Sequence, residues 1–298
     1  MRSLLFVPGD SERKLAKSLG VGADALIFDL EDSIGPDRKS IARTMVAEFL
    51  RAPDVRAAPV VFWVRINAFD TAHWEDDLTT VMAAAPDGIM LPKSTSGDDV
   101  ASLSVALGKL ETRFGLKHGQ TQILPIATEV PISLLRMETY VGISPRMTVF
   151  SWGCEDLSAE LGAMSSRDPA GRLTSPFRLA RDLCLMTAVA SGAQPVDTVF
   201  VNFRDNSGLE TECDEAVRDG FTGKVAIHPS QVPIINAAFT PDEDQIAWAH
   251  HVTAVFQDTT TGVASLHGEM LDRPHLKRAQ TILARADAAA RGADTLSP

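Results

Sequence analysis

The sequence predicts a (β/α)₈ barrel, and three observations lead to this fold class. The chain has 298 residues and 45% hydrophobic content, and a barrel of roughly 250 residues commonly forms a single domain. Short apolar runs recur at fairly even intervals with helix-like stretches between them, which favours a closed parallel barrel over an open sheet. No GxGxxG motif follows the first run, so a dinucleotide-binding Rossmann domain has no support.

Eight apolar runs are expected to form the barrel strands. They are near-continuous rather than alternating, as is typical of strands buried on both faces. Helices are expected between them, for example over Asp37–Leu50 and Asp98–Phe114, and a polar loop over Ser165–Pro176. The predicted strands are Leu4–Val7, Ala25–Phe28, Val60–Ile66, Gly88–Leu91, Gln122–Ala127, Met147–Ser151, Thr198–Phe203 and Lys224–Ile227.

The chain continues well beyond the eight predicted βα units. These units are complete near Phe239, so we expect a barrel domain over residues 1–239. Residues 240–298 are expected to form a C-terminal helical arm, with one helix, a short Gly-containing stretch ending in LDRP, and a last helix after Pro274.

Composition excludes several classes of function. The formal net charge is −11 and is spread along the chain, which argues against nucleic acid as a partner, because phosphate binding needs a basic face. The three cysteines form no CxxC pair, which fits a reducing compartment. No apolar run approaches the ~20 residues of a membrane span, and the first apolar run is too short for a secretory signal. We therefore expect a cytoplasmic protein without a membrane partner.

Charged and polar residues follow nearly every predicted strand. Barrel enzymes build their active sites at the C-terminal ends of strands, so these side chains are expected to meet at one mouth. Any one of them alone could be a solvated loop charge or a helix N-cap. Together they form a cluster of mixed sign, made of Asp10, Asp29, Glu31, Asp32, Arg65, Asn67, Lys93, Glu129, Glu155, Asp156, Asn202, Arg204 and His228.

This cluster predicts a metal site. Oxygen ligands without Cys or paired His favour Mg²⁺, with Mn²⁺ as the alternative, over zinc. Glu129 and Asp156 follow neighbouring strands, so both can reach one ion. Glu31 and Asp32 can orient water ligands of that ion.

Several short motifs occur in a fixed order along the chain. They are RSLLFVPGD from Arg2, DALIFDLEDSI from Asp24, VRIN from Val64, GIMLPK from Gly88, GCEDL from Gly153, DTVF from Asp197, GFTGKVAIHPSQ from Gly220 and MLDRPHLKRA from Met270. Each motif alone is weak, but their order and spacing are specific. Over nearly the whole chain they resemble the citrate lyase β-subunit-like branch of the HpcH/HpaI aldolase superfamily.

The resemblance implies a (β/α)₈ barrel, a divalent metal and a thioester substrate. It implies that Glu129 and Asp156 bind the metal and that Arg65 lies in the active site. It also implies that Arg13 and Lys17 hold the nucleotide end of coenzyme A. Their i,i+4 spacing places both on one helix face, as it would for a solvated basic face.

The expected activity is that of a carbon–carbon lyase. A 3-hydroxyacyl-CoA such as malyl-CoA or citramalyl-CoA would be cleaved into, or formed from, an acyl-CoA and a 2-oxo acid, with the metal acidifying the hydroxyl. Arg65 would stabilise the thioester enolate, and Lys93 would help to bind the substrate. Three alternatives are a malyl-CoA thioesterase, a citrate lyase β subunit acting on an acyl-carrier-protein thioester, and a non-catalytic binding protein. Many family members have a small hydroxyl residue where this chain has Val130, so the acyl group stays open.

The enolate also needs an acid that protonates its carbon. The resemblance places Asp272 in the active site of a neighbouring subunit, as general acid/base of a homotrimer or a hexamer built as a dimer of trimers. Gly262–Met270 is rich in Gly and polar residues, so we expect it to extend as a hinged lid while the arm packs on that subunit. The simpler alternative for Asp272 is a helix N-cap.

Overall fold

The computed structural model describes residues 1–257, 263–266 and 269–294, and the chain divides into two compact units. Unit 1 is Met1–Ile235 and unit 2 is Asn236–Pro298, so the division falls inside α10 (Val232–Phe239). No helix in the described part of the chain is long and apolar enough to cross a membrane.

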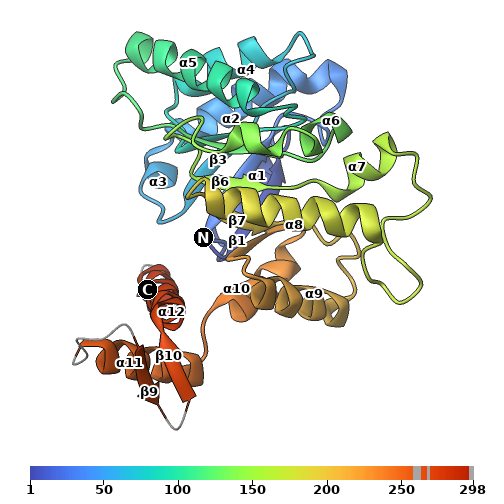
Figure 1. Cartoon of the computed structure of the whole chain (residues 1–298). Helices are drawn as coiled ribbons and strands as arrows, with labels where there is room; N and C mark the ends of the chain where they lie inside the picture. The colour runs from blue at the N-terminus through green and yellow to red at the C-terminus, as the bar shows by residue number, and fades with distance from the viewer. Residues whose placement is uncertain (258–262, 267–268, 295–298) are drawn as a thin grey trace. The chain divides into compact units, whose positions relative to one another are not determined.

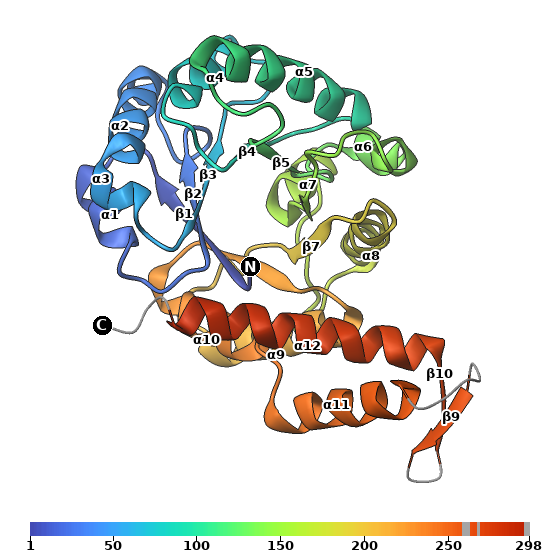
Figure 2. The same ribbon diagram turned by 90° about the vertical axis from the view of Figure 1, so that its left-hand side faces the viewer.

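Unit 1 contains a nearly closed barrel of eight parallel strands in the described residues, which confirms the predicted fold class (Figures 1 and 2). The hydrogen-bonded order is β5-β4-β3-β2-β1-β8-β7-β6, and bridges from Ile123 to Met147 and from Ile126 to Ser151 connect the two ends. The strands are β1 (Ser3–Pro8), β2 (Ala25–Asp29), β3 (Val61–Arg65), β4 (Gly88–Leu91), β5 (Gln122–Pro125), β6 (Val149–Ser151), β7 (Gln194–Asp197) and β8 (Gly223–Ala226).

Helices surround the strands, as Figure 2 shows. The two helices expected from the sequence are confirmed, and α5 begins where Ser96 accepts a hydrogen bond from the Asp98 amide. The polar loop expected over Ser165–Pro176 joins α7 to α8, and its last two residues open α8. The helices of unit 1 are α1 (Glu12–Ser18), α2 (Lys39–Arg51), α3 (Pro53–Arg56), α4 (Trp74–Met82), α5 (Gly97–Phe114), α6 (Pro131–Leu134), α7 (Cys154–Glu160), α8 (Ser175–Ala190) and α9 (Asn206–Asp219), with 3₁₀ turns η1 (Pro36–Arg38), η2 (Met137–Tyr140) and η3 (Pro229–Gln231).

Alternate strand residues fill a hydrophobic core cluster within the barrel. Trp63 on β3 is the largest of them, and it lies in register with Gly88 on β4. A Cβ on residue 88 would lie 2.2 Å from the Trp63 ring, so only glycine leaves room for the indole. The buried members of this cluster are Leu4, Ala25, Ile27, Trp63, Met90, Leu124, Ile126, Val149, Val196 and Val225.

The predicted seventh strand was wrong. The strand is Gln194–Asp197, and the apolar run Thr198–Phe203 follows it as irregular structure. The sequence QPVD lacks the apolar pattern of a buried strand. Only Val196 faces the core, whereas Asp197 forms a buried ion pair with Lys224 outside it. The predicted site residues Asn202 and Arg204 consequently lie in an exposed loop rather than at a strand end.

Unit 2 has its own small core. It contains α11 (Glu243–Gln257), an antiparallel pair of strands β9 (Val263–Leu266) and β10 (Glu269–Asp272), and α12 (Arg273–Asp294). The buried members of its core cluster are Ala249, Val252, Leu271, Ala279 and Ile282. The lid expected over Gly262–Met270 lies partly outside the described residues, since 262, 267 and 268 are not described. The described remainder is paired in the hairpin.

Candidate active site

Arg65 and Asp29 form the fixed part of the barrel mouth. They lie in register at the ends of β3 and β2, where Arg65 Nε and Nη2 donate to the two Asp29 oxygens at 2.7 and 2.8 Å. Burial opposes the ionised Asp29, but Arg65 outweighs it and lowers the Asp29 pKa to about 2. Arg65 Nη1 lies 3.0 Å from Glu31 Oε2, and the guanidinium stacks 4.5 Å from the centre of the Phe6 ring. A guanidinium group has five N–H donors, so Arg65 keeps N–H groups that do not face Asp29 or Glu31 and can donate to a substrate oxygen.

Lys93 connects the carboxylates of the mouth. It follows β4 with a backbone φ of 50°, and its amide donates to Glu129 Oε2 at 2.5 Å. Its ammonium group pairs with Glu31 and lies 3.1 Å from Asp32 and 3.7 Å from Asp156. Burial disfavours the charged amine, but the bonds to Glu31 and Asp32 outweigh burial and raise the Lys93 pKa.

Glu129 is the most constrained acid of the mouth. It follows β5, its side chain is almost fully buried, and Gly153 packs against it so closely that a Cβ there would lie 2.5 Å from Glu129 Cγ. Thr128 Oγ1 holds this glycine in place by accepting a hydrogen bond from its amide at 3.0 Å. Burial, with the nearby charges of Asp156 and Glu31, raises the Glu129 pKa to about 8. The fold therefore holds the Glu129 carboxylate at a position where nearby cations do not fully compensate its negative charge.

We name seven charged residues together the mouth cluster. When all are ionised, its five carboxylates exceed its two cations by a charge of −3. Glu31 Oε2 is buried and forms an ion pair with Arg65 Nη1, but it accepts no well-oriented hydrogen bond from any described residue. The members of the mouth cluster are Asp29, Glu31, Asp32, Arg65, Lys93, Glu129 and Asp156.

The mouth cluster fits a hard divalent cation. Glu129 and Asp156 together line two adjoining cavities of about 80 and 480 Å³, so both acids face the same space. Arg65 and Trp152 line the smaller one, together with Thr198 from the segment after β7. No group of three or more His, Cys, Asp or Glu is arranged to hold a metal in the described residues. Mg²⁺ needs only one or two carboxylates, since water and substrate complete its shell.

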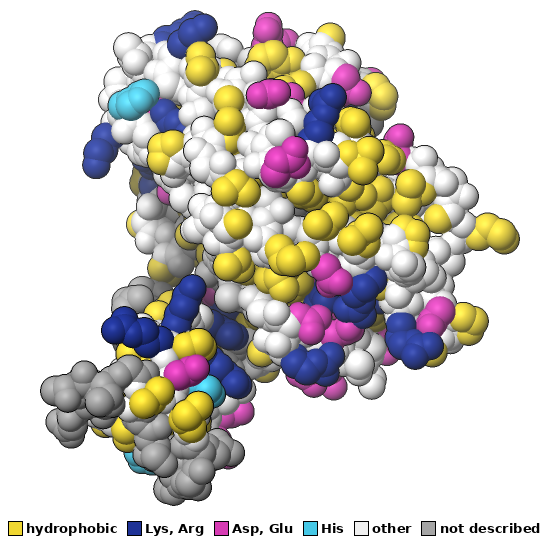
Figure 3. Space-filling model, viewed as in Figure 1, with side chains coloured by type: hydrophobic (Ala, Val, Ile, Leu, Met, Phe, Trp, Pro, Cys, Tyr) yellow, Lys and Arg dark blue, Asp and Glu magenta, His cyan; other side chains and the backbone are white. Residues whose placement is uncertain are grey.

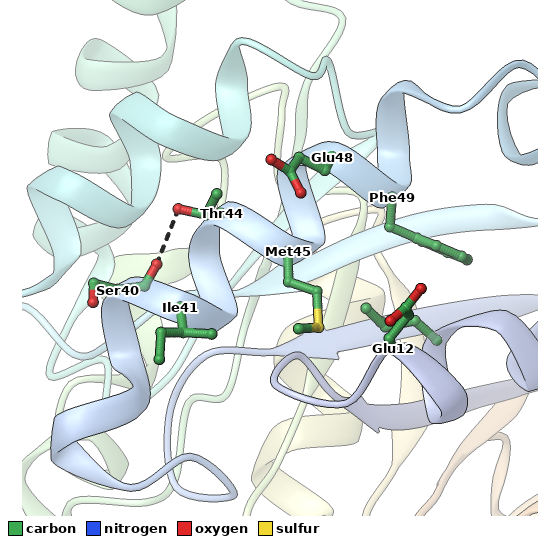
Figure 4. Close-up of a pocket in the computed structure, with 8 residues that line it drawn as sticks. Glu12, Ser40, Ile41, Thr44, Met45, Glu48 and Phe49 are labelled. Carbon is green, nitrogen blue, oxygen red and sulfur yellow. Dashed lines mark hydrogen bonds between the residues drawn. The ribbon is translucent and has the colours of Figure 1, made fainter.

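Arg13 and Lys17 lie away from the mouth cluster, on α1. With Lys14, which the sequence analysis missed, they line a cavity of about 310 Å³ whose other walls include Phe6 and His228. A wider groove of about 690 Å³ lies between α1 and α2 (Figure 4), but it carries Glu12 and Glu48. Of these two cavities, the one with the three cations has the charge that suits a phosphorylated ligand.

Three other predicted strand-end residues have structural contacts. Asp10 accepts from Arg38 Nε at 2.7 Å, and Asn67 Nδ2 donates to Asp77 Oδ2 at 2.6 Å. Arg204 extends over the Phe203 ring, 5.7 Å from its centre.

Asp272 lies in unit 2, at the end of β10 and directly before α12. Its Oδ1 is 2.6 Å from His275 Nδ1, and both side chains are 42% exposed. The His275 partner was not expected, although the DRPH motif places the two residues three apart, where side chains meet on a helix turn.

Comparison with known proteins agrees with this architecture. The sequence matches the HpcH/HpaI aldolase/citrate lyase family over residues 2–229 and a C–C bond lyase of the TIM-barrel fold over residues 178–290. It is 34% identical to a (3S)-malyl-CoA thioesterase of Cereibacter sphaeroides over 97% of this chain and 95% of that protein. It is 33% identical to the mitochondrial citramalyl-CoA lyase of Rattus norvegicus over 96% of this chain and 86% of that protein.

A solved structure extends the likeness to three dimensions. The protein CitE of Mycobacterium tuberculosis, in complex with magnesium, acetoacetate and coenzyme A, superimposes with a TM-score of 0.77 at 31% identity. The match covers 96% of this chain and 100% of that one. With the family match over most of the chain and the same barrel, this chain belongs to the HpcH/HpaI aldolase/citrate lyase family and is an enzyme of the carbon–carbon lyase type.

Proposed function

We propose that this protein is an Mg²⁺-dependent lyase for a 3-hydroxyacyl-CoA such as malyl-CoA or citramalyl-CoA, and that it forms an acyl-CoA and a 2-oxo acid. The observation that carries the proposal is the state of Glu129, a buried carboxylate facing Asp156 across a shared cavity in a cluster with excess negative charge. A divalent cation would supply the missing charge. The magnesium and coenzyme A bound by the M. tuberculosis relative support the choice of ligands.

In this proposal Glu129 and Asp156 hold the metal, and Glu31 and Asp32 orient its water ligands. Bound Mg²⁺, or Mn²⁺ in its place, would acidify the substrate hydroxyl and stabilise the new 2-oxo acid. Arg65 directs its remaining N–H groups at the thioester oxygen, where charge develops as the carbon–carbon bond breaks. The Asp29 pair holds this guanidinium in one orientation before substrate arrives.

The remaining substrate contacts follow from charge. Arg13 and Lys17, with Lys14 between them, would bind the phosphates of coenzyme A, since all three line one cavity with apolar walls suited to the rest of the cofactor. Lys93 lines the larger mouth cavity together with Glu129 and Asp156, so it can also meet a substrate carboxylate there. Three free, buried cysteines fit a reducing compartment, and we infer a cytoplasmic location.

We further propose that the chain works as a homotrimer or hexamer. In that assembly residues 240–298 form an arm that packs on a neighbouring subunit, and Asp272 serves that subunit's active site as general acid/base. The half-exposed carboxylate of Asp272 at the end of a hairpin supports this role. α8 also exposes apolar side chains on the barrel face seen in Figure 3, and assembly would cover them. They are Leu179, Met186 and Val189.

Thioester hydrolysis is the second candidate, because the Cereibacter relative is named a malyl-CoA thioesterase. A citrate lyase β subunit acting on an acyl carrier protein is the third, since such a subunit from Leuconostoc mesenteroides is 32% identical over 96% of this chain. The basic cavity on α1 favours free coenzyme A over a carrier protein.

Product analysis tests the proposal. Purified enzyme with Mg²⁺ is incubated with malyl-, citramalyl- and citryl-CoA, and both the 2-oxo acid and free coenzyme A are quantified. A lyase releases oxo acid in step with acyl-CoA, whereas stoichiometric free coenzyme A would establish the thioesterase. Asp156→Ala should lose activity and metal binding while keeping the circular dichroism of the barrel; native Mg²⁺ affinity in that variant would refute the metal assignment.

Mixed oligomers test the arm. Asp272→Ala and Asp156→Ala subunits are each expected to be inactive, and exchange of protomers should restore part of the activity, because some sites then receive both intact groups. No recovery in oligomers shown by mass spectrometry to be mixed would place Asp272 in its own subunit's site or outside catalysis.

A further inference from the structure

Lys93 occupies an unusual backbone conformation at the centre of the mouth cluster. Its φ of 50° lies in the left-handed region, which is uncommon for residues other than glycine, asparagine and aspartate. Such a conformation persists where surrounding contacts require it, and it recurs at functional sites. At this position it lets the backbone amide and the side chain of one residue reach different acids.

The two ends of Lys93 contact the two groups of carboxylates separately. The amide donates to Glu129 Oε2 at 2.5 Å, so the backbone holds one proposed metal ligand. The ammonium group pairs with Glu31 and lies 3.1 Å from Asp32, the two acids that are not proposed ligands. Its distance to Asp156, the other proposed ligand, is 3.7 Å, beyond a good hydrogen bond.

A second lysine nearby shows what a purely structural contact looks like. Lys39 is buried, and its ammonium group donates to the carbonyl oxygens of Leu30 and Glu31 at 2.9 and 2.7 Å. These bonds fix the loop after β2. Lys93 instead points at carboxylate side chains and is 28% exposed, so its charge acts on the cluster and on whatever binds there.

We propose that Lys93 is a positioning residue that acts as an internal counter-ion, engaging Glu31 and Asp32 so that a metal is left with Glu129 and Asp156. This inference rests on the proposed metal site. Because like charges repel, the ammonium group also weakens metal binding. Lys93 thus limits both the affinity of the site and the number of protein oxygens around the ion.

The number of oxygens bears on which metal binds. Mg²⁺ keeps several waters and uses one or two carboxylates, whereas Ca²⁺ takes six to eight oxygens with flexible geometry. Without the Lys93 ammonium group, Asp32 loses this partner and Glu31 keeps its pair with Arg65, so the mouth offers more uncompensated carboxylate oxygens. Removal of the ammonium group should therefore favour Ca²⁺ more than Mg²⁺, an effect that loss of a structural contact would not produce.

Calorimetric titration of the full-length protein with Mg²⁺ and with Ca²⁺ tests this inference at about pH 9, which lies above the raised pKa of Glu129, so the carboxylates of the mouth are ionised. Lys93→Met keeps the backbone amide and removes the charge. It should bind Mg²⁺ at least about tenfold more tightly, with a larger gain for Ca²⁺. Lys93→Arg keeps the charge and should stay within about threefold of the wild type. Lys117→Met, at an exposed position, is the matched control and should leave both affinities unchanged.

The outcomes separate the inference from the function on which it rests. A folded Lys93→Met protein with unchanged or weaker Mg²⁺ affinity, or an equal gain for both ions, overturns the counter-ion role. Lys93→Gln provides the same comparison if the methionine variant does not fold. If the wild type shows no Mg²⁺ binding that Glu129→Gln removes, the proposed metal site fails instead.

Discussion

Two partly buried ionic clusters lie in the same barrel, but their charges are arranged in opposite ways. The mouth cluster has five carboxylates and two cations. The second cluster, here named the outer network, lies between β7, β8 and the helices α8 and α9, and it has four of each. Its members are Arg167, Arg178, Arg181, Lys224, Asp197, Glu212, Glu215 and Asp219.

Each charge of the outer network is matched within the protein. Lys224 is fully buried and lies 3.1 Å from Asp197 and 2.6 Å from Glu212. Burial raises the pKa of Asp197, but Lys224 and Arg181 outweigh it, so the pKa is lowered overall. Its hydrogen bonds are less complete, since Arg181 Nη2 has no partner among the described residues. The charges nevertheless balance without a ligand.

The comparison distinguishes a structural cluster from a binding site. In the outer network an acid is held ionised by its neighbours, whereas at the mouth burial and like charges raise the Glu129 pKa to about 8. The two regions also touch, because Trp152 lines the mouth and donates from its indole to Asp197 at 2.7 Å. A balanced network thus supports the wall of an unbalanced site, and substitutions in the two regions should differ in kind.

The largest contrast is expected between two arginines. Arg65→Lys should lower kcat/KM by about a thousandfold, because lysine cannot reproduce the planar fork that pairs with Asp29 and still faces substrate. Arg178→Lys in the outer network should keep kcat/KM within about twofold, since its ion pair with Glu215 is about one-third exposed and neither residue lines the mouth cavities. Steady-state kinetics with the preferred CoA ester checks both. Near-normal kcat/KM in Arg65→Lys would argue against direct substrate contact.

Asp197→Asn should be the most destabilising change in the outer network. It leaves buried Lys224 and Arg181 without their shared carboxylate, and breaking a buried pair costs about 3–5 kcal/mol. Urea unfolding with and without Mg²⁺ measures the loss, which should be the same in both conditions. A loss that Mg²⁺ reverses would connect Asp197 to the metal rather than to the network.

Another balanced buried pair predicts the response to acid. Glu111 on α5 pairs with Arg146 at 2.6 and 2.7 Å, and although burial raises its pKa, Arg146 and the amides of Gly119 and Thr121 lower it to about 2, from 4.5. Because the folded pKa is depressed, this stabilisation is full above pH 4.5 and is lost as the pH falls toward 2. The loss amounts to about 3 kcal/mol. Glu111→Gln should flatten this part of the curve of unfolding free energy against pH, and an unchanged slope would contradict the assignment.

Glu129→Gln should have the smallest effect on the free energy of unfolding, and it should stabilise the protein, whereas Asp197→Asn destabilises it. The pKa of Glu129 is raised from 4.5 to about 8, so the wild type loses stability as the pH rises through this window. Glutamine removes the charge and keeps an acceptor for the Lys93 amide, so the metal-free variant should gain about 1 kcal/mol at neutral pH after local relaxation. It should also lose the increase in Tm that Mg²⁺ gives the wild type. A metal-free Tm below that of the wild type would contradict an uncompensated charge at the mouth.

Sequence patterns determined the barrel and most of its mouth. Continuous apolar runs must be buried on both faces, and residues that follow parallel strands must meet at one end, so Asp29, Arg65, Lys93 and Glu129 were identifiable from position alone. The same reasoning missed β7, because a strand with an outward Asp197 has no apolar signature. Because β7 ends at Asp197, the expected site residues Asn202 and Arg204 lie in a loop instead of at a strand end.

Tertiary structure alone decided how these charges combine. The sequence shows Lys93 only as a cation after a strand, whereas its positive φ and its separate contacts to Glu129 and Glu31 depend on the neighbouring strands. Spacing along the chain also cannot show that Lys224 meets Asp197 outside the barrel while Glu129 lacks a matching cation inside it. The physical reason is that residue types set which charges exist, but the pKa of each group depends on burial and on distances between charges, and only the folded chain fixes these.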